Sequence, residues 1–443
     1  MNLTERLRER ARGGYAHDEL DEEAADEIER LRQALEEIAK ILGSVARKCC
    51  IAFIYAMLFV SSTVAYEGVV TTRNQLLDAF DKNAHSANSR SVFYTFQPGL
   101  QRLRVVAQNF ITDEHPVGCS VTYTGSVEYP MGTFSQLLFS GVPSTTLPDL
   151  SIQFSDYLTL PTPIQPGVPG WVHFHLTSPC GIPYQNIMFS NGRWGDSFYV
   201  CACADLPDST MGGPGGNGTA TNGFVPPIAV LGETSLPTFV SWGDSIEWGA
   251  GWQPMDHYGN VGPVSRSLGM NFAHMKFARS GEAMTIITSV GNALRRSLLK
   301  YASASVNALG VNDFVSRATH DMVTNAQTIA GWSQAAFPGS QTFAIAFTMR
   351  DRSSTGKWTT LAEQTIAATG YQEQDRVDYN TGCRAGFPFL TACFDIASKV
   401  ESSPNSGKWR VDLGRITMDG IHPNTAGAAL MASGYVPKLL HYP

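Results

Sequence analysis

The stretch 236–251, LPTFVSWGDSIEWGAG, decides the fold that we expect for the second half of the chain. It begins as an apolar, β-prone run and then turns through Gly-Asp-Ser. Open parallel sheets carry their functional residues on loops just beyond the carboxyl ends of strands, which is where this pattern places Ser245. The letters WGDS also occur at 194–197, but β-prone residues follow them without a turn. We therefore predict a functional role for Ser245 and expect Ser197 to begin an ordinary strand.

Residues 228–443 alternate apolar β-prone runs with helical patterns, which predicts a parallel sheet covered by helices on both faces. The loops that follow the next strands carry further polar or small residues. The second loop contains Gly281, the third contains Asn312, and a late loop before the final helix contains Asp419 and His422.

These residue types fit the needs of acyl transfer. A serine hydroxyl is a poor nucleophile until a base removes its proton, and His422 is the candidate base for Ser245. The imidazole needs a carboxylate on its other nitrogen, and Asp419 lies three residues earlier in the same loop. The oxyanion of the intermediate needs donors, for which the main-chain N–H groups of Ser245 and Gly281 and the amide of Asn312 are candidates.

Three ordered blocks resemble the SGNH, or GDSL-type, hydrolase superfamily: GDSI at 243–246, GVND at 310–313 and DGIHPN at 419–424. The glycine block rests on Gly281 alone, and Ile246 stands where leucine is commonest in the family. The resemblance covers roughly 236–443. It implies a three-layer α/β/α fold similar to flavodoxin, a metal-independent serine esterase with no cofactor, and acylated polysaccharides, lipids or thioesters as substrates.

Two tryptophans follow the candidate nucleophile, Trp248 and Trp252. They are candidates for stacking on a sugar ring, although large aromatic residues more often serve packing. We expect the neighbouring Glu247, and Lys276 on the next strand, to be solvated.

Residues 67–204 consist of short β-prone runs separated by turn residues, which predicts an antiparallel β-sandwich or jelly roll. The stretch 205–227 is rich in Gly, Pro, Ser and Thr and reads as a linker before a catalytic domain at 228–443.

Residues 1–48 form an acidic segment with a helical pattern. Its apolar residues at 28–45 repeat at spacings of three and four, which fits an oligomerising helix or, given the short length, a plain amphipathic one. The segment 49–66 follows two basic residues and carries an apolar run. A secretory signal, a signal-anchor through 51–65 and a buried helix all fit it. We expect a secreted or membrane-anchored protein, with a virion-associated or cytoplasmic location as the alternative.

The composition argues against nucleic acid and zinc as binding partners. The net charge is -7, so the chain lacks the basic field that binds nucleic acid. None of the eight cysteines has the spacing of a zinc site. Cys383 and Cys393 could close a short disulfide, and the four cysteines between 119 and 203 could pair or remain reduced.

The leading hypothesis is a serine esterase that removes O-acetyl groups from carbohydrate. A lipase, lysophospholipase or thioesterase of the same fold is the nearest alternative, and a non-catalytic glycan-binding surface or virion protein is the alternative from another class.

Overall fold

The computed structural model describes the part of the chain from which the site is built. The described residues are 65–111, 114–186, 195–203, 206–212, 218–221, 223–251, 255–290, 292–314, 319–366 and 373–441, together with Arg30 and Gln33. Residues 65–443 form one compact unit. The predicted helix within 1–48 and the apolar segment 51–65 lie outside the described residues, apart from Arg30, Gln33 and Ala65. Among the described residues, no helix has the length and apolar character needed to cross a membrane.

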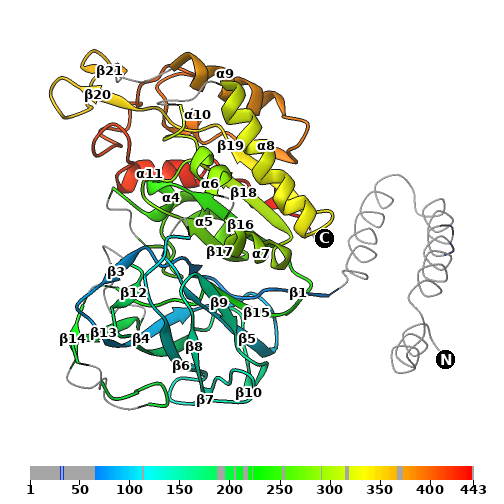
Figure 1. Ribbon diagram of the computed structural model, residues 1–443. Coiled ribbons are helices and arrows are strands. Elements are labelled where there is room, and N and C mark those ends of the chain that lie inside the picture. The colour runs from blue at the N-terminus through cyan, green and yellow to red at the C-terminus, as the bar shows by residue number, and fades with distance from the viewer. Residues whose placement is uncertain are drawn as a thin grey trace. The chain divides into compact units, whose positions relative to one another are not determined.

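A six-stranded parallel sheet, in the order β2-β17-β16-β18-β19-β22, carries the predicted site (Figure 1). The strands are β2 (Asn74–Gln75), β17 (Ala273–Ala278), β16 (Thr238–Gly243), β18 (Ala304–Ala308), β19 (Gln341–Ile345) and β22 (Ala392–Phe394). Every residue of β16, β17 and β18 is buried. This burial explains their near-continuous apolar sequence, because a parallel sheet is covered on both faces.

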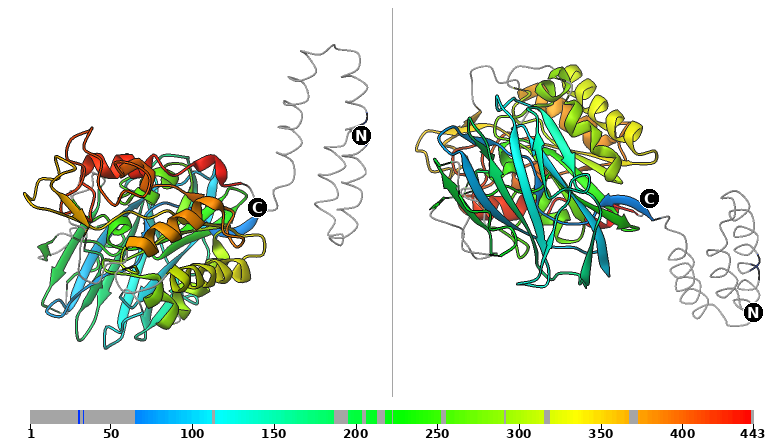
Figure 2. Two further views of the ribbon diagram at one scale, coloured as in Figure 1. Left: turned by 90° about the horizontal axis from the view of Figure 1, so that it is seen from above. Right: turned by 60° about the horizontal axis from the view of Figure 1, so that its bottom comes forward.

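Two groups of helices cover this sheet. The first contains α6 (Met284–Val290), α7 (Ala293–Ser297), α8 (Thr319–Ala336) and α9 (Glu373–Ala385), and the second contains α4 (Ser245–Trp248), α5 (Pro263–Ser267), α10 (Ala397–Val400) and α11 (Thr425–Ala432). Helices contact one another within each group. In the left view of Figure 2, α8 and α11 lie on opposite sides of the sheet. The parallel sheet predicted from the second half of the chain is therefore present.

Two antiparallel sheets occupy the rest of the unit, and the right view of Figure 2 brings them forward. The first contains β1 (Tyr66–Val69), β15 (Ala229–Thr234), β5 (Leu100–Asn109), β10 (Leu158–Ile164) and β9 (Ser151–Phe154). The second contains β14 (Thr219–Ala220), β13 (Ser197–Cys201), β4 (Ser86–Phe93), β11 (Gly170–Thr177), β6 (Val121–Glu128), β7 (Phe134–Gln136) and β8 (Ser144–Leu147). Both sheets contribute to one buried apolar cluster that includes Leu103, Val105, Val172 and Phe174. The assignment of this region to a jelly roll or sandwich domain stays a prediction.

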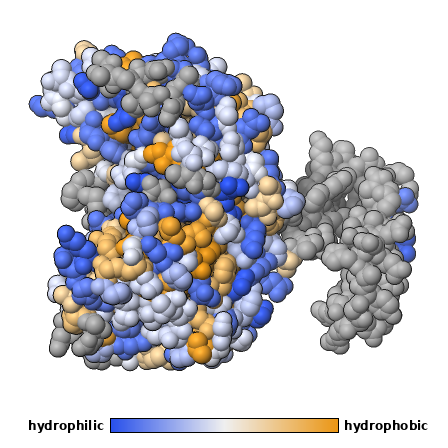
Figure 3. All heavy atoms as spheres, in the orientation of Figure 1, coloured by the Kyte–Doolittle hydropathy of each residue, from blue (hydrophilic) through white to orange (hydrophobic). Residues whose placement is uncertain are grey.

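The antiparallel and parallel sheets exchange strands, which differs from the expected boundary at 228. Strand β15 pairs with β1 and β5 rather than joining the parallel sheet. In the other direction, β2 comes from the β-rich region and pairs with β17. The stretch 205–227, which we expected to be a linker, contributes instead to the antiparallel part of the unit. Its strand β14 pairs with β13, and its Phe224 is fully buried. On the face shown in Figure 3, hydrophobic residues gather over the middle of the unit.

Short elements complete the described chain. Strand β3 (Ala79–Asp81) pairs with β12 (Ile182–Tyr184), and β20 (Asp351–Ser353) pairs with β21 (Gln364–Ile366). Single 3-10 turns lie at Leu268–Met270, Leu299–Tyr301 and Pro437–Leu439.

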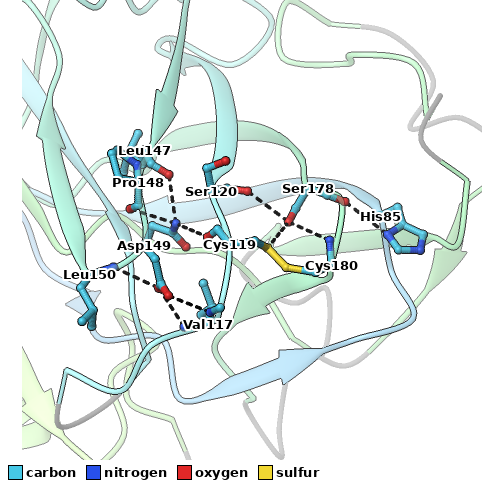
Figure 4. The surroundings of a disulfide bond; sticks show 12 residues. His85, Val117, Cys119, Ser120, Leu147, Pro148, Asp149, Leu150, Ser178 and Cys180 are labelled. Atoms are coloured by element: carbon cyan, nitrogen blue, oxygen red, sulfur yellow. Dashed lines mark hydrogen bonds between the residues drawn. A yellow bond between two sulfur atoms is a disulfide. The ribbon is translucent and has the colours of Figure 1, made fainter.

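Three disulfides join cysteines of the described residues: Cys119–Cys180, Cys201–Cys203 and Cys383–Cys393. Figure 4 shows the first, which ties the loop after β5 to the turn after β11. Beside it Asp149 accepts hydrogen bonds from the main-chain N–H groups of Val117, Gly118 and Leu150, so this corner of the antiparallel sheets is held by polar contacts too.

Candidate active site

Ser245 is the first residue of α4 and follows the end of β16 by two positions. The carboxylate of Asp244 accepts a hydrogen bond from the main-chain N–H of Ile246 at 2.9 Å and so caps this one-turn helix. Ser245 is largely buried, with 7% of the residue's surface exposed. Its hydroxyl oxygen lies 2.8 Å from Nε2 of His422. This contact joins residues 177 positions apart in the chain, as the motif order predicts.

His422 and Asp419 lie on the loop that precedes α11. Nδ1 of His422 lies 2.8 Å from Oδ2 of Asp419, while Oδ1 of Asp419 accepts the main-chain N–H groups of Ile421 and His422. Partial burial by itself would raise the pKa of Asp419. The hydrogen bonds from the His422 ring and from these two N–H groups outweigh it and hold that pKa at about 2. The carboxylate is therefore charged and orients the imidazole that faces Ser245.

Strand register brings the remaining candidates to the same edge. Gly243 of β16 is directly opposite Ala278 of β17 on one side and Ala308 of β18 on the other. Gly281 follows the first of these partners by three residues, and Asn312 follows the second by four. Both candidates therefore lie on loops that adjoin the Ser245 loop, at the carboxyl edge of the sheet.

Hydrogen bonds link the Gly281 loop to the Asn312 loop. The side-chain amide of Asn312 donates to the main-chain carbonyl of Glu282 at 2.8 Å. The carboxylate of Asp313, which is 1% exposed, accepts the main-chain N–H groups of Met284 and Thr285 and thereby holds the start of α6. Gly281 has φ +79 and no atom within 4 Å of the position that a Cβ would take, so its backbone conformation is the reason for glycine there.

A buried ion pair supports these loops from beneath. Glu282 and Arg295 are paired through both carboxylate oxygens, at 3.1 and 3.2 Å, and both side chains are fully buried. The Arg295 guanidinium also lies over the ring of Trp242 in β16, 5.4 Å from its centroid. Separating this buried pair would leave two charges without their partner, so the contact resists displacement of either loop.

Glu247 and Lys276 differ from expectation, because both are buried rather than solvated. The Glu247 carboxylate accepts the main-chain N–H groups of Val264 and Ser265 and the Ser265 hydroxyl, which caps α5. Burial raises the pKa of Glu247, and the nearby charge of Lys276 opposes that rise. A structural carboxylate two residues after the nucleophile carries no signal in the sequence, because the helix that it caps lies beyond a long loop.

Trp248 is half-buried, and its indole N–H donates to the carboxylate of Asp78. Trp252 lies outside the described residues. The predicted role of these two tryptophans in stacking on a sugar ring stays a prediction.

Gly251 is a site residue that the sequence did not reveal. A Cβ there would lie 2.2 Å from the carbonyl oxygen of Pro423 and 3.2 Å from Cβ of His422, so glycine is required where this loop passes the histidine.

In the second WGDS copy, Asp196 and Ser197 take part in strand pairing and a buried ion pair. Ser197 begins β13, as predicted. The carboxylate of Asp196 pairs with Arg73 at 2.8 Å and accepts the main-chain N–H of Val92, with both charged side chains almost fully buried.

In the described part of the chain, no three His, Cys, Asp or Glu side chains are arranged to hold a metal ion.

Comparison with known proteins finds only remote structural similarity. No family model and no curated protein sequence matches the chain. Among solved structures, a GDSL-like lipase from Bacteroides thetaiotaomicron is 13% identical and covers 44% of this chain and 84% of its own, with a TM-score of 0.30. A carbohydrate acetylesterase from Sinorhizobium meliloti is 14% identical over 44% of this chain and 95% of its own, with a TM-score of 0.30. A family two carbohydrate esterase from Clostridium thermocellum, in complex with cellohexaose, is 13% identical, covers 81% of this chain and 95% of its own, and has a TM-score of 0.30.

Proposed function

We propose that this protein is a serine-dependent ester hydrolase in which Ser245 is the nucleophile, His422 the general base and Asp419 the residue that orients His422. The observation that carries the proposal is the continuous hydrogen-bonded line from Asp419 through His422 to Ser245, with 2.8 Å at each step. Both distances fall in the range required for proton transfer and for tautomer control.

In this mechanism the Ser245 oxygen bonds to the acyl carbon as its proton passes to Nε2 of His422. The carbonyl oxygen becomes an oxyanion, for which the main-chain N–H groups of Ser245 and Gly281 and the Asn312 amide are the proposed donors. The N–H of Ser245 suits this role, since the first residue of a helix has no acceptor within that helix. Collapse of the intermediate breaks the ester bond, and the leaving alcohol takes the proton from His422. Water, activated by the same histidine, then hydrolyses the acyl-enzyme.

For the substrate we propose an O-acetylated carbohydrate. The exposure of the site supports this choice, because the Asp419 side chain is 50% exposed and that of His422 is 24% exposed. An ester group carried on a large polar molecule can approach such an open site. Hydrolysis rates on acetylated xylan, other acetylated glycans and p-nitrophenyl esters of increasing chain length test this choice. A preference for long acyl chains would favour the lipase or thioesterase alternative.

The esterase proposal is tested by p-nitrophenyl acetate hydrolysis with the whole chain and with Ser245→Ala. We expect the substitution to abolish turnover above background. Ser197→Ala is the matched control, because it removes the same hydroxyl from the other WGDS copy, and it should retain wild-type activity. Equal rates for the wild type and Ser245→Ala would overturn the proposal and favour a binding-only protein.

A further inference from the structure

The helix that carries Ser245 is too short to fix its own orientation. α4 spans only Ser245–Trp248, and the Ser245 carbonyl accepts the N–H groups of Gly249 and Ala250 at its end. A single turn has few hydrogen bonds to resist rotation, so its position depends on outside contacts. Asp244, the residue before the helix, caps the start of the turn. Two side chains of the turn make outside contacts: the Glu247 carboxylate accepts the N–H groups of Val264 and Ser265, and the Trp248 indole donates to Asp78 at the end of the turn.

Asp78 reaches the indole of Trp248 because β2 belongs to the six-stranded parallel sheet. Asn74 and Gln75 pair in parallel with Met275 and Lys276 of β17, so the chain beyond Gln75 emerges at the same edge as the loop after β16. The N–H of Leu76 extends this pairing with a bond to the Lys276 carbonyl. Asp78 therefore arrives at the carboxyl edge of the sheet, although it belongs to the β-rich part of the sequence.

Asp78 is itself held firmly. Its carboxylate accepts the main-chain N–H of Asn186 at 2.7 Å and the side-chain amide of Gln185 at 3.0 Å, and its own N–H donates to the Tyr184 carbonyl. Burial raises the pKa of Asp78 to about 6, although these hydrogen bonds and the charge of Lys276 pull it down. A carboxylate held by contacts from β12 and its continuation is a rigid acceptor for the indole.

We propose that Asp78 is a positioning residue for the Ser245 nucleophile, acting through the indole N–H of Trp248 to hold α4 in register with His422. This inference rests on the proposed esterase function. A small displacement of α4 would lengthen the contact between the Ser245 hydroxyl and His422. Misalignment of the reacting groups lowers the rate of the chemical step. Since the contact orients the nucleophile and binds no substrate, its loss should lower kcat and leave KM nearly unchanged.

The test is a double-mutant cycle on the full chain with p-nitrophenyl acetate. We expect Asp78→Ala and Trp248→Phe each to lower kcat about 5- to 20-fold, with KM within two-fold of wild type. The double variant should be no slower than the slower single variant, because both changes remove one interaction. Asp78→Asn keeps an acceptor oxygen for the indole and should recover kcat to within about three-fold of wild type.

Asp149→Ala is the control for general destabilisation. It also removes a carboxylate that accepts main-chain N–H groups in the antiparallel part, but it has no hydrogen bond to α4. It should lower the melting temperature without changing kcat. Trp248→Phe keeps an aromatic ring, so it reports on the hydrogen bond even if Asp78→Ala fails to fold.

The outcomes separate this inference from the proposed function. Single losses that multiply in the double variant, or a rise in KM at constant kcat, would overturn the positioning role while Ser245-dependent hydrolysis still supports the esterase. A wild-type protein without Ser245-dependent hydrolysis would overturn both.

Discussion

The side-chain amide of Asn312 donates to the main-chain carbonyl of Glu282 at 2.8 Å, so two loops proposed to stabilise the oxyanion fix one another. An amide nitrogen has two N–H groups, and this bond uses one of them. The bond therefore sets the direction of the second N–H, which would be the one that meets the oxyanion.

Asn312→Ala is expected to lower kcat about 10²- to 10³-fold, the usual cost of losing one oxyanion donor. KM should change little, since the donor acts on charge that develops in the transition state. Steady-state kinetics on p-nitrophenyl acetate check this prediction. A loss of less than three-fold would remove Asn312 from the oxyanion hole.

Asp419→Asn is expected to lower kcat about 10³- to 10⁴-fold, because a neutral amide no longer fixes the tautomer or stabilises the charge of His422. The depressed pKa of about 2 means that the interaction is present above the ordinary pKa of an aspartate and is lost only as pH falls toward 2. Above pH 4 the Asp419 carboxylate stays ionised, so the pH–rate profile of the wild type should contain no step that is due to Asp419. Asp412→Asn, which changes an exposed aspartate paired with Arg410, is the control and should keep wild-type kcat.

Gly251→Ala is expected to lower kcat about 10- to 100-fold, since the added methyl would collide with the Pro423 carbonyl and displace His422. Gly386→Ala separates this collision from the cost of the left-handed backbone. Gly386 has φ +90 but no atom within 4 Å of its Cβ position, so its variant should lose stability and keep kcat. Similar kinetics for the two variants would show that Gly251 does not position the histidine.

Asp244 makes the stability of the protein depend on pH. Burial raises its pKa to about 7, the carboxylates of Asp313 and Glu282 push in the same direction, and the Ile246 N–H and His422 oppose them. Because the folded-state pKa is raised, the stabilising contribution of the protonated form is fully present below about pH 3.9 and is lost as pH rises through about 7.

Asp244→Asn cannot ionise, so its free energy of unfolding relative to wild type should increase by about 2–4 kcal/mol between pH 4 and pH 8. Urea unfolding at these two pH values measures the change. Ser197→Ala should follow the wild-type pH dependence. A difference between Asp244→Asn and wild type that does not vary with pH would contradict the raised pKa.

The sequence motifs predicted that three distant residues would meet, and the structure shows these contacts. Ser245, Asp419 and His422 stand after buried strands or before a helix, and the order of these loops was sufficient to predict their meeting. The parallel sheet was predictable for the same reason, since strands covered on both faces have continuous apolar runs.

The features that sequence missed depend on contacts between distant segments. Strand β2 is only two residues long and shows no periodicity, so nothing marked Asp78 as a neighbour of Trp248. The apolar run of β15 would read the same in either sheet, which is why the expected boundary at 228 fell before a strand of the antiparallel sheet. Glu247 looked like a surface residue because the helix that it caps is remote in sequence.

The exchange of strands between the sheets has a consequence for how the protein is made. β1 pairs with β15, with Tyr66 opposite Thr234, and β2 pairs with β17, with Gln75 opposite Lys276. During synthesis from the N-terminus, β1 must therefore wait for about 170 further residues and β2 for about 200 before their partners exist. Neither sheet can close early on the ribosome, and contacts of such long range slow folding. A gene fragment cut near residue 228 would separate both strand pairs, so residues 228–443 alone would lack strands on which both sheets depend, and the proposed active site could not be transferred to another protein as a C-terminal module.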